Sequence, residues 1–187
     1  MLAFSIAVLF GLGPAPAWAF MERVGVSIGL SVERVGVLYA MGTALGLTGP
    51  LLATAFGARW GRVRPIAMAS ILLAIACLGF GYVASAAGYV VTMLLFWPSY
   101  MFLYAFIFAT VAVADPSGRL GPLTIGAYML VLALGPAFGG MLVAAGSYAA
   151  PGWFAVAVVA LMLAVLFGFR RRLNGLDFAP PGAPERV

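Results

Sequence analysis

The stretch that decides the fold is PIAMASILLAIACLGFGYVASAAGYVVTMLLFWPSYMFLYAFIFATVAVA, residues 65–114. None of these fifty residues is charged. Because about 20 apolar residues in a helix cross the hydrocarbon core of a bilayer, this stretch is long enough for two crossings and a turn. The turn is expected at SAAG, residues 85–88, where small residues interrupt the bulky ones. The stretch therefore predicts a pair of transmembrane helices.

Three further uncharged stretches repeat this pattern. Residues 1–21 and 35–58 provide one crossing each, and residues 120–169 provide two crossings around a turn at 145–152. We therefore expect an all-α, polytopic membrane protein with six transmembrane helices, near residues 2–21, 35–57, 65–84, 89–113, 121–144 and 153–170. They form one domain over residues 1–172. Residues 173–187, rich in proline and glycine, are expected to be a disordered cytoplasmic tail.

The composition excludes several classes of protein. The chain has 187 residues, of which 65% are hydrophobic and 8% are charged, whereas soluble domains carry roughly 25% charged residues. A soluble enzyme and a nucleic-acid-binding module are therefore excluded. The chain has no histidine and one cysteine, Cys77, so we expect no catalytic residue, no metal site and no cofactor. A membrane-embedded enzyme is the least favoured hypothesis.

The arginines predict the orientation. All ten basic residues are arginine, and an even number of crossings places both termini on one side. With that side cytoplasmic, the inner segments hold eight arginines, namely Arg59, Arg62, Arg64, Arg119, Arg170, Arg171, Arg172 and Arg186. The outer segment 22–34 holds two, each beside a glutamate. The positive-inside rule thus predicts cytoplasmic termini, and we expect the chain to be integral to the lipid bilayer of a bacterial plasma (inner) membrane.

The N-terminal segment has a competing interpretation. The run APAWA, residues 15–19, faintly resembles a signal-peptide cleavage site. A signal peptide begins with a positive charge, which this segment lacks, and cleavage would leave five crossings. We therefore interpret residues 2–21 as the first transmembrane helix.

Glycine and proline interrupt several predicted helices. The second and fifth both carry a Gly-Pro pair, and the first and fourth both carry prolines. Interruptions at matching positions are typical of a three-plus-three repeat and point to a transport site, although kinks that merely improve packing explain them equally well. The candidate hinge residues are Gly49, Pro50, Gly135, Pro136, Gly139 and Gly140. GxxxG patterns at 42–46 and 135–139 predict close helix contacts.

One loop carries the most informative motif. Residues 57–65, GARWGRVRP, join the second and third predicted helices, and Gly61 permits a tight turn there. The segment resembles the loop G-x-x-x-D-R-x-G-R-R of the major facilitator superfamily. The motif-loop residues are Arg59, Gly61, Arg62 and Arg64, of which the first three match the family pattern. Ala58 replaces the aspartate of the family pattern, and Thr54 replaces its leading glycine. The family carries a second, degenerate copy of this loop in its C-terminal six helices, and these losses resemble that copy. Arginines that only fix topology remain the alternative.

Other stretches extend the resemblance over residues 10–172. GPAFGG, residues 135–140, resembles the end of the G-P-x-x-G-G motif of antiporters, and DPSGR, residues 115–119, resembles a loop between late helices of the family. The resemblance implies one half of a major-facilitator-type bundle. It implies transport of a small organic solute by alternating access, with a second six-helix half from another chain or a second copy, and export is the direction that the antiporter-like motif suggests. The alternative is a non-transporting, degenerate or structural membrane protein that packs with a partner half.

Aromatic and hydroxyl residues provide the candidate solute site. In the resembled family, the equivalents of the first, second, fourth and fifth helices line the cavity. The residues there are Trp18, Thr43, Trp97, Tyr100, Tyr104 and Tyr128. A cavity with aromatic walls and few charges suits an amphipathic or apolar molecule, although interfacial anchoring is the alternative for Trp18. Glu22 and Arg23 are a candidate external gate, with ordinary interfacial charges as the alternative.

The predicted topology is directly testable. Single cysteines placed in each connecting loop of a chain with Cys77→Ala should alternate between labelling from outside and labelling from inside, because six crossings reverse direction at every loop. Membrane-impermeant maleimide applied to intact cells and to inverted vesicles measures this. An odd number of crossings contradicts the six-helix assignment.

Overall fold

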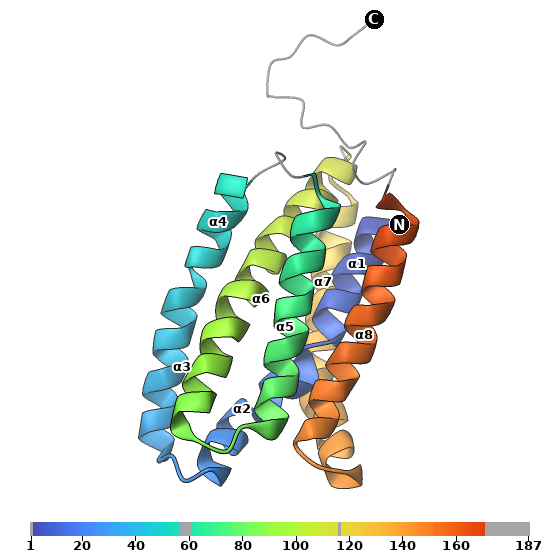
Figure 1. Cartoon of the computed structure of the whole chain (residues 1–187). Helices are drawn as coiled ribbons and strands as arrows, with labels where there is room; N and C mark the ends of the chain where they lie inside the picture. The colour runs from blue at the N-terminus through green and yellow to red at the C-terminus, as the bar shows by residue number, and fades with distance from the viewer. Residues whose placement is uncertain (1, 57–60, 116, 171–187) are drawn as a thin grey trace, which may run out of the picture.

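The computed structural model describes residues 2–56, 61–115 and 117–170, and in this part the chain forms helices and no strand (Figure 1). The helices are α1 Leu2–Leu12, α2 Ala15–Ser27, α3 Val32–Gly46, α4 Thr48–Phe56, α5 Val63–Tyr82, α6 Ala86–Ala114, α7 Leu120–Ala145 and α8 Ala149–Gly168. They make six spans long and apolar enough to cross a membrane, with α1–α2 and α3–α4 counted as one span each. The predicted all-helical class and the six crossing-length helices are confirmed.

Proline ends helices in the first two spans. A proline lacks the N–H that would bond the carbonyl four residues earlier. Pro16 is four residues after Leu12, where α1 ends, and Pro50 is four residues after Gly46, where α3 ends. The prolines in the fourth and fifth spans, by contrast, lie inside uninterrupted helices. The matching interruptions expected from sequence are therefore confined to the first half of the chain.

In α6 Pro98 lies inside an uninterrupted helix, beside a serine that bonds the preceding turn. The side chain of Ser99 donates hydrogen bonds to the carbonyls of Leu95 and Phe96, in the turn before the proline. Pro98 itself removes the N–H that would bond the Leu94 carbonyl, one residue before these acceptors. The helix nevertheless continues for 29 residues.

The connection between the first two spans is shorter than expected. The expected helices near 2–21 and 35–57 leave residues 22–34 between them, but α2 continues to Ser27 and α3 begins at Val32. Gly29 turns the chain with φ +87°, and the Ser31 side chain accepts a hydrogen bond from the Arg34 N–H to cap α3. The charged residues are exposed on helical turns beyond the apolar core, where water satisfies them.

The spans pack in three main pairs. α5 packs against α8, α1 and α2 pack along α7, and α3 and α4 pack along α6. α5 also packs against α6, and α1 against α8, which joins the pairs into one bundle (Figure 1). Among the described spans, α7 and α3–α4 have the smallest buried share.

Glycines bring the backbones of all three pairs into contact, and between α5 and α8 a Cβ added at Gly152 would lie 2.7 Å from the Cys77 carbonyl oxygen. A Cβ added at Gly49 of α4 would lie 2.6 Å from the carbonyl oxygen of Pro98 on α6. A Cβ added at Gly139 of α7 would lie 3.0 Å from the carbonyl oxygen of Pro16 on α2. The tight backbone contact predicted from the GxxxG patterns is confirmed, since Gly42 and Gly46 also pack on α6 and Gly135 packs on α2.

The two ends of the bundle differ in charge. The start of α1 and the end of α8 lie at the same end (Figure 1). Arg62, Arg64, Arg119 and Arg170 flank helices that begin or finish there, and we call it the arginine-rich end. Asp115 lies there too and caps α7 by accepting a hydrogen bond from the Leu120 N–H. That bond lowers the pKa of the Asp115 carboxyl.

The Gly49 crossing predicts a sharp stability difference. In Gly49→Ala the new methyl would meet backbone atoms, 2.5 Å from the Phe102 nitrogen, so we expect a loss of about 1–3 kcal/mol. Gly126→Ala on α7 is the matched control, because nothing lies within 4 Å of its Cβ position. Unfolding of the purified chain in detergent, followed by circular dichroism, measures both. Equal stability of the two variants would contradict the close contact.

Candidate functional site

One face of α6 carries four aromatic rings at a spacing of four residues. They are Phe96, Tyr100, Tyr104 and Phe108. Residues four apart lie above one another on a helix, and the ring centroids are 5.6 Å apart for Phe96 and Tyr100 and 4.6 Å apart for Tyr104 and Phe108. This face is a continuous aromatic surface through the middle of the span.

Two further rings close on this surface from α1 and α7. The Phe10 centroid lies 5.2 Å from that of Tyr100 and 5.7 Å from that of Tyr128. The Tyr128 ring also lies 5.7 Å from Tyr104, and its hydroxyl shares a hydrogen bond with the Tyr100 hydroxyl. Gly11 leaves the room that Tyr128 fills, because a Cβ there would lie 2.8 Å from the ring. Three spans thus meet at one polar contact inside an apolar cluster.

Trp97 extends the cluster toward the second span. Its ring lies 5.0 Å from that of Tyr39 and contacts the backbone of α3 at Gly42. The side chain is only 5% exposed, and its Nε1–H has no hydrogen-bond partner among the residues that the structure describes. An unpaired buried donor costs about 1–3 kcal/mol, so this contact is held by packing alone. We call Phe10, Phe96, Trp97, Tyr100, Tyr104, Phe108 and Tyr128 the aromatic cluster.

The structure brings four of the six predicted cavity residues together in this cluster. Trp18 and Thr43 are half-buried and reach the cluster through Tyr39, with which both side chains share a hydrogen bond. The Thr43 hydroxyl donates to the Tyr39 carbonyl oxygen of its own helix, at 2.9 Å. Tyr128 is buried, whereas Tyr100 and Tyr104 are half-buried and leave part of the cluster open at the bundle surface.

The proposed gate residues lie near the end of α2. Glu22 and Arg23 are both exposed. The Arg23 guanidinium lies over the Phe20 ring, 5.2 Å from its centroid, a cation–π contact. Among the described residues, no ion pair joins Glu22 and Arg23.

The motif loop is partly described. Gly61 has φ +69°, as the tight turn requires. Arg62 is only 3% exposed and donates to the Thr110 hydroxyl of α6 at 3.2 Å, whereas Arg64 is exposed. Arg59 lies outside the described residues. The loop therefore sets one arginine against the bundle and presents another at its surface.

The candidate hinge residues are four glycines and two prolines. Gly49, Gly135 and Gly139 are buried at helix crossings, and a Cβ at Gly140 would come only within 3.9 Å of Phe20. Pro50 follows the interruption between α3 and α4, whereas Pro136 lies inside the continuous α7.

No metal-binding group is found within the described ranges, where no three His, Cys, Asp or Glu side chains come together. No protein-family model, curated protein or solved structure matches this chain. Its function is therefore inferred from the arrangement of its residues.

Sequence reasoning missed three members of the cluster. Phe96 and Phe108 extend the four-residue spacing of Tyr100 and Tyr104 by one turn on each side, so the pattern was available in the sequence. Phe10 had no such signal, because its place depends on how the first span packs against α6 and α7.

The tyrosine pair predicts a coupled loss of stability. Tyr128→Phe leaves the Tyr100 hydroxyl without its recorded partner inside the cluster, so we expect a loss of about 1–3 kcal/mol, and the double variant with Tyr100→Phe should lose less than the sum of the two single variants. Unfolding in detergent measures the cycle. Tyr82→Phe is the control, because its bond to Trp153 is exposed and should contribute little. Strictly additive losses would contradict the hydrogen bond.

Proposed function

We propose that this chain is one half of a major-facilitator-type transporter, which moves a small organic solute by alternating access. The observation that carries the proposal is the pairing of the spans. The first span packs along the fifth and the second along the fourth, while the third packs against the sixth. Exchanging spans one to three with spans four to six reproduces this set of pairs.

Two of the glycine crossings support the same exchange. Gly49 of the second span approaches the carbonyl of Pro98 in the fourth, and Gly139 of the fifth span approaches the carbonyl of Pro16 in the first. In each case a glycine, which has no side chain, packs on a helix that contains a proline. The exchange turns the pair of second and fourth spans into the pair of fifth and first spans. An internal repeat of three plus three helices accounts for both. Because three crossings reverse direction, the two repeats are inverted, an arrangement typical of secondary transporters.

The aromatic cluster is the proposed wall of the solute site. The half-buried Tyr100 and Tyr104 belong to the fourth span, and Tyr128 belongs to the fifth. Trp18 and Thr43, which are added to the wall, belong to the first and second spans. These rings offer apolar faces and hydroxyl groups near mid-span without a charge among them. Such a wall suits an amphipathic or apolar organic solute.

A second six-helix half is the proposed partner. The least buried spans, α7 and α3–α4, expose large apolar side chains such as Met41, Leu51, Leu130 and Leu134. The half-buried rings of the cluster would lie between this chain and the partner. Rocking of one half against the other would then open the site to each side in turn.

The proposed orientation places the arginine-rich end in the cytoplasm of a bacterial cell, with the chain in the plasma membrane. Four described arginines flank helices at that end, against two at the other. The antiporter-like run at 135–140 supports export as the direction. Buried Arg62, which bonds α6 at this end, would hold the cytoplasmic side of the half together.

A second candidate function is structural. The loss of the motif aspartate at position 58 and the closed contacts within the aromatic cluster favour a non-transporting protein that packs with a partner half. The two candidates differ in whether any solute crosses the membrane.

Flux measurements separate the candidates. Proteoliposomes that contain the chain alone, or the chain co-expressed with a six-helix N-terminal half of a major-facilitator-type transporter, are loaded with a panel of fluorescent aromatic dyes. We expect efflux above that of empty liposomes when both halves are present. In Tyr104→Ala, which removes a ring from the wall, efflux should fall about three- to tenfold.

Leu161→Ala is the matched control, because this residue is 55% exposed on α8, away from the cluster. It should leave efflux unchanged. Absence of flux with and without the partner, over the whole panel, contradicts transport and favours the structural function.

A further inference from the structure

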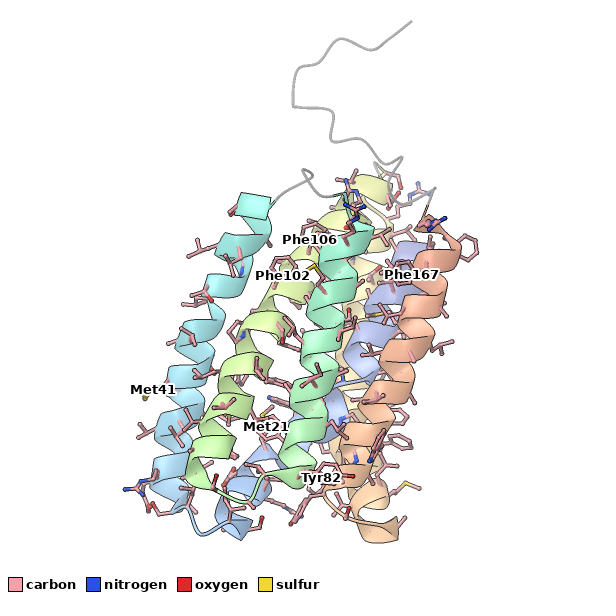
Figure 2. All side chains as sticks on the ribbon, viewed as in Figure 1. Met21, Met41, Tyr82, Phe102, Phe106 and Phe167 are labelled. Atoms are coloured by element: carbon pink, nitrogen blue, oxygen red, sulfur yellow. The ribbon has the colours of Figure 1, made fainter. Side chains whose placement is uncertain are left out.

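A groove lies on the face of α6 that turns away from the aromatic cluster. α4 and α5 each pack on α6, and the space between them has a volume of about 300 Å³. Figure 2 shows Phe102 of α6 between α4 and α5. The groove is lined by Leu52, Pro65, Met68, Ala69, Leu72, Leu94, Leu95, Pro98, Ser99 and Phe102.

The groove has a buried floor and an exposed rim. Ala69, Ser99 and Phe102 are 6–8% exposed and form the floor. Met68 and Leu94 are about half exposed and form part of the rim. The Ser99 hydroxyl already donates to backbone carbonyls of α6, and the other lining side chains are apolar, so the groove offers no side-chain donor. An apolar occupant fits this lining.

The position of the groove indicates an occupant from the bilayer. It lies between membrane-spanning helices and is open on one side, and its volume equals on the order of ten water-sized groups. A methylene group is similar in size to a water molecule. One lipid acyl chain therefore fills it better than a bulky side chain.

The arginine-rich end supplies a charge for the headgroup. Arg64 is exposed, and Met68 and Leu72 follow it at intervals of four residues on the same face of α5. The groove thus runs along α5 from a guanidinium at the end of the span toward mid-span. Arginine beside an apolar groove matches a lipid with a negative phosphate, because the charge and the chain are then satisfied together.

We propose that the groove between α4, α5 and α6 binds one anionic phospholipid, with an acyl chain against Ala69 and Phe102 and its phosphate at Arg64. This site is independent of transport, and it takes its lipid from the leaflet that faces the arginine-rich end.

Photo-crosslinking tests the site in the full chain. The protein is reconstituted in phosphatidylcholine nanodiscs that contain a trace of phosphatidylglycerol with a diazirine in its acyl chain, and labelled peptides are identified by mass spectrometry. The second arm uses diazirine-labelled phosphatidylcholine. We expect phosphatidylglycerol to label α4, α5 and α6 around the groove more strongly than the exposed face of α8.

Two variants and a control make the result specific. Arg64→Gln should lower groove labelling by phosphatidylglycerol about fivefold and leave labelling by phosphatidylcholine unchanged. Ala69→Phe should lower groove labelling by both lipids, because the ring occupies the floor, and Leu161→Phe on α8 should change neither. Arg64 is exposed, so Arg64→Gln tests the proposal even where Ala69→Phe fails to fold.

Equal labelling of the groove and α8 overturns the proposal, since it indicates annular lipid only. The proposal is also overturned when Arg64→Gln leaves labelling by phosphatidylglycerol unchanged. It is overturned as well when neither lipid labels the groove, because a partner half or a solute then occupies it. These outcomes leave the transport proposal untouched, because flux is measured separately.

Discussion

The structure depends on how backbone groups at prolines are accommodated inside lipid. A transmembrane helix has no water to satisfy carbonyls that a proline leaves unbonded, so the chain must end the helix, supply a hydroxyl or bring another helix close. Two responses occur here. Helices end four residues before Pro16 and Pro50, whereas α6 continues through Pro98, and Gly49 lets α4 pack on the α6 backbone at that level. The third pair, α5 and α8, is brought close by glycines instead, Gly81 and Gly152.

α6 connects the two proposed sites. Its ring-bearing face joins the aromatic cluster, which includes residues of α1 and α7, and its opposite face forms the floor of the groove between α4 and α5. Pro98 and Ser99 line the groove at the same level at which Trp97 and Tyr100 join the cluster. A change in the path of α6 at this level therefore affects both faces at once.

Much of the fold could be predicted from the sequence because lipid imposes simple constraints. Uncharged length fixes the number of crossings, and glycine patterns at 42–46 and 135–139 mark close contacts. Helix ends were less predictable. The charges at Glu22 and Glu33 suggested a loop, but helices extend through them because exposed turns near a bilayer surface tolerate charge.

The candidate site was predictable only where it lies on one helix. Tyr100 and Tyr104 follow from a four-residue spacing, whereas Phe10 and the groove depend on contacts between spans distant in sequence. The unpaired Nε1–H of Trp97 likewise has no signal in the sequence, because burial is decided by packing against α3.

The lengths of the connections make the two ends of the bundle mechanically unequal. At the end away from most arginines, residues 28–31, 83–85 and 146–148 tie neighbouring helices with three or four residues each. A residue spans at most about 3.6 Å, so these short tethers keep the helix ends adjacent. The connections 57–62 and 115–119 at the other end are longer. The tethered end is therefore held by short connections, whereas at the arginine-rich end side-chain hydrogen bonds, from Arg62 to Thr110 and from the Leu120 N–H to Asp115, join elements that longer connections leave free to separate.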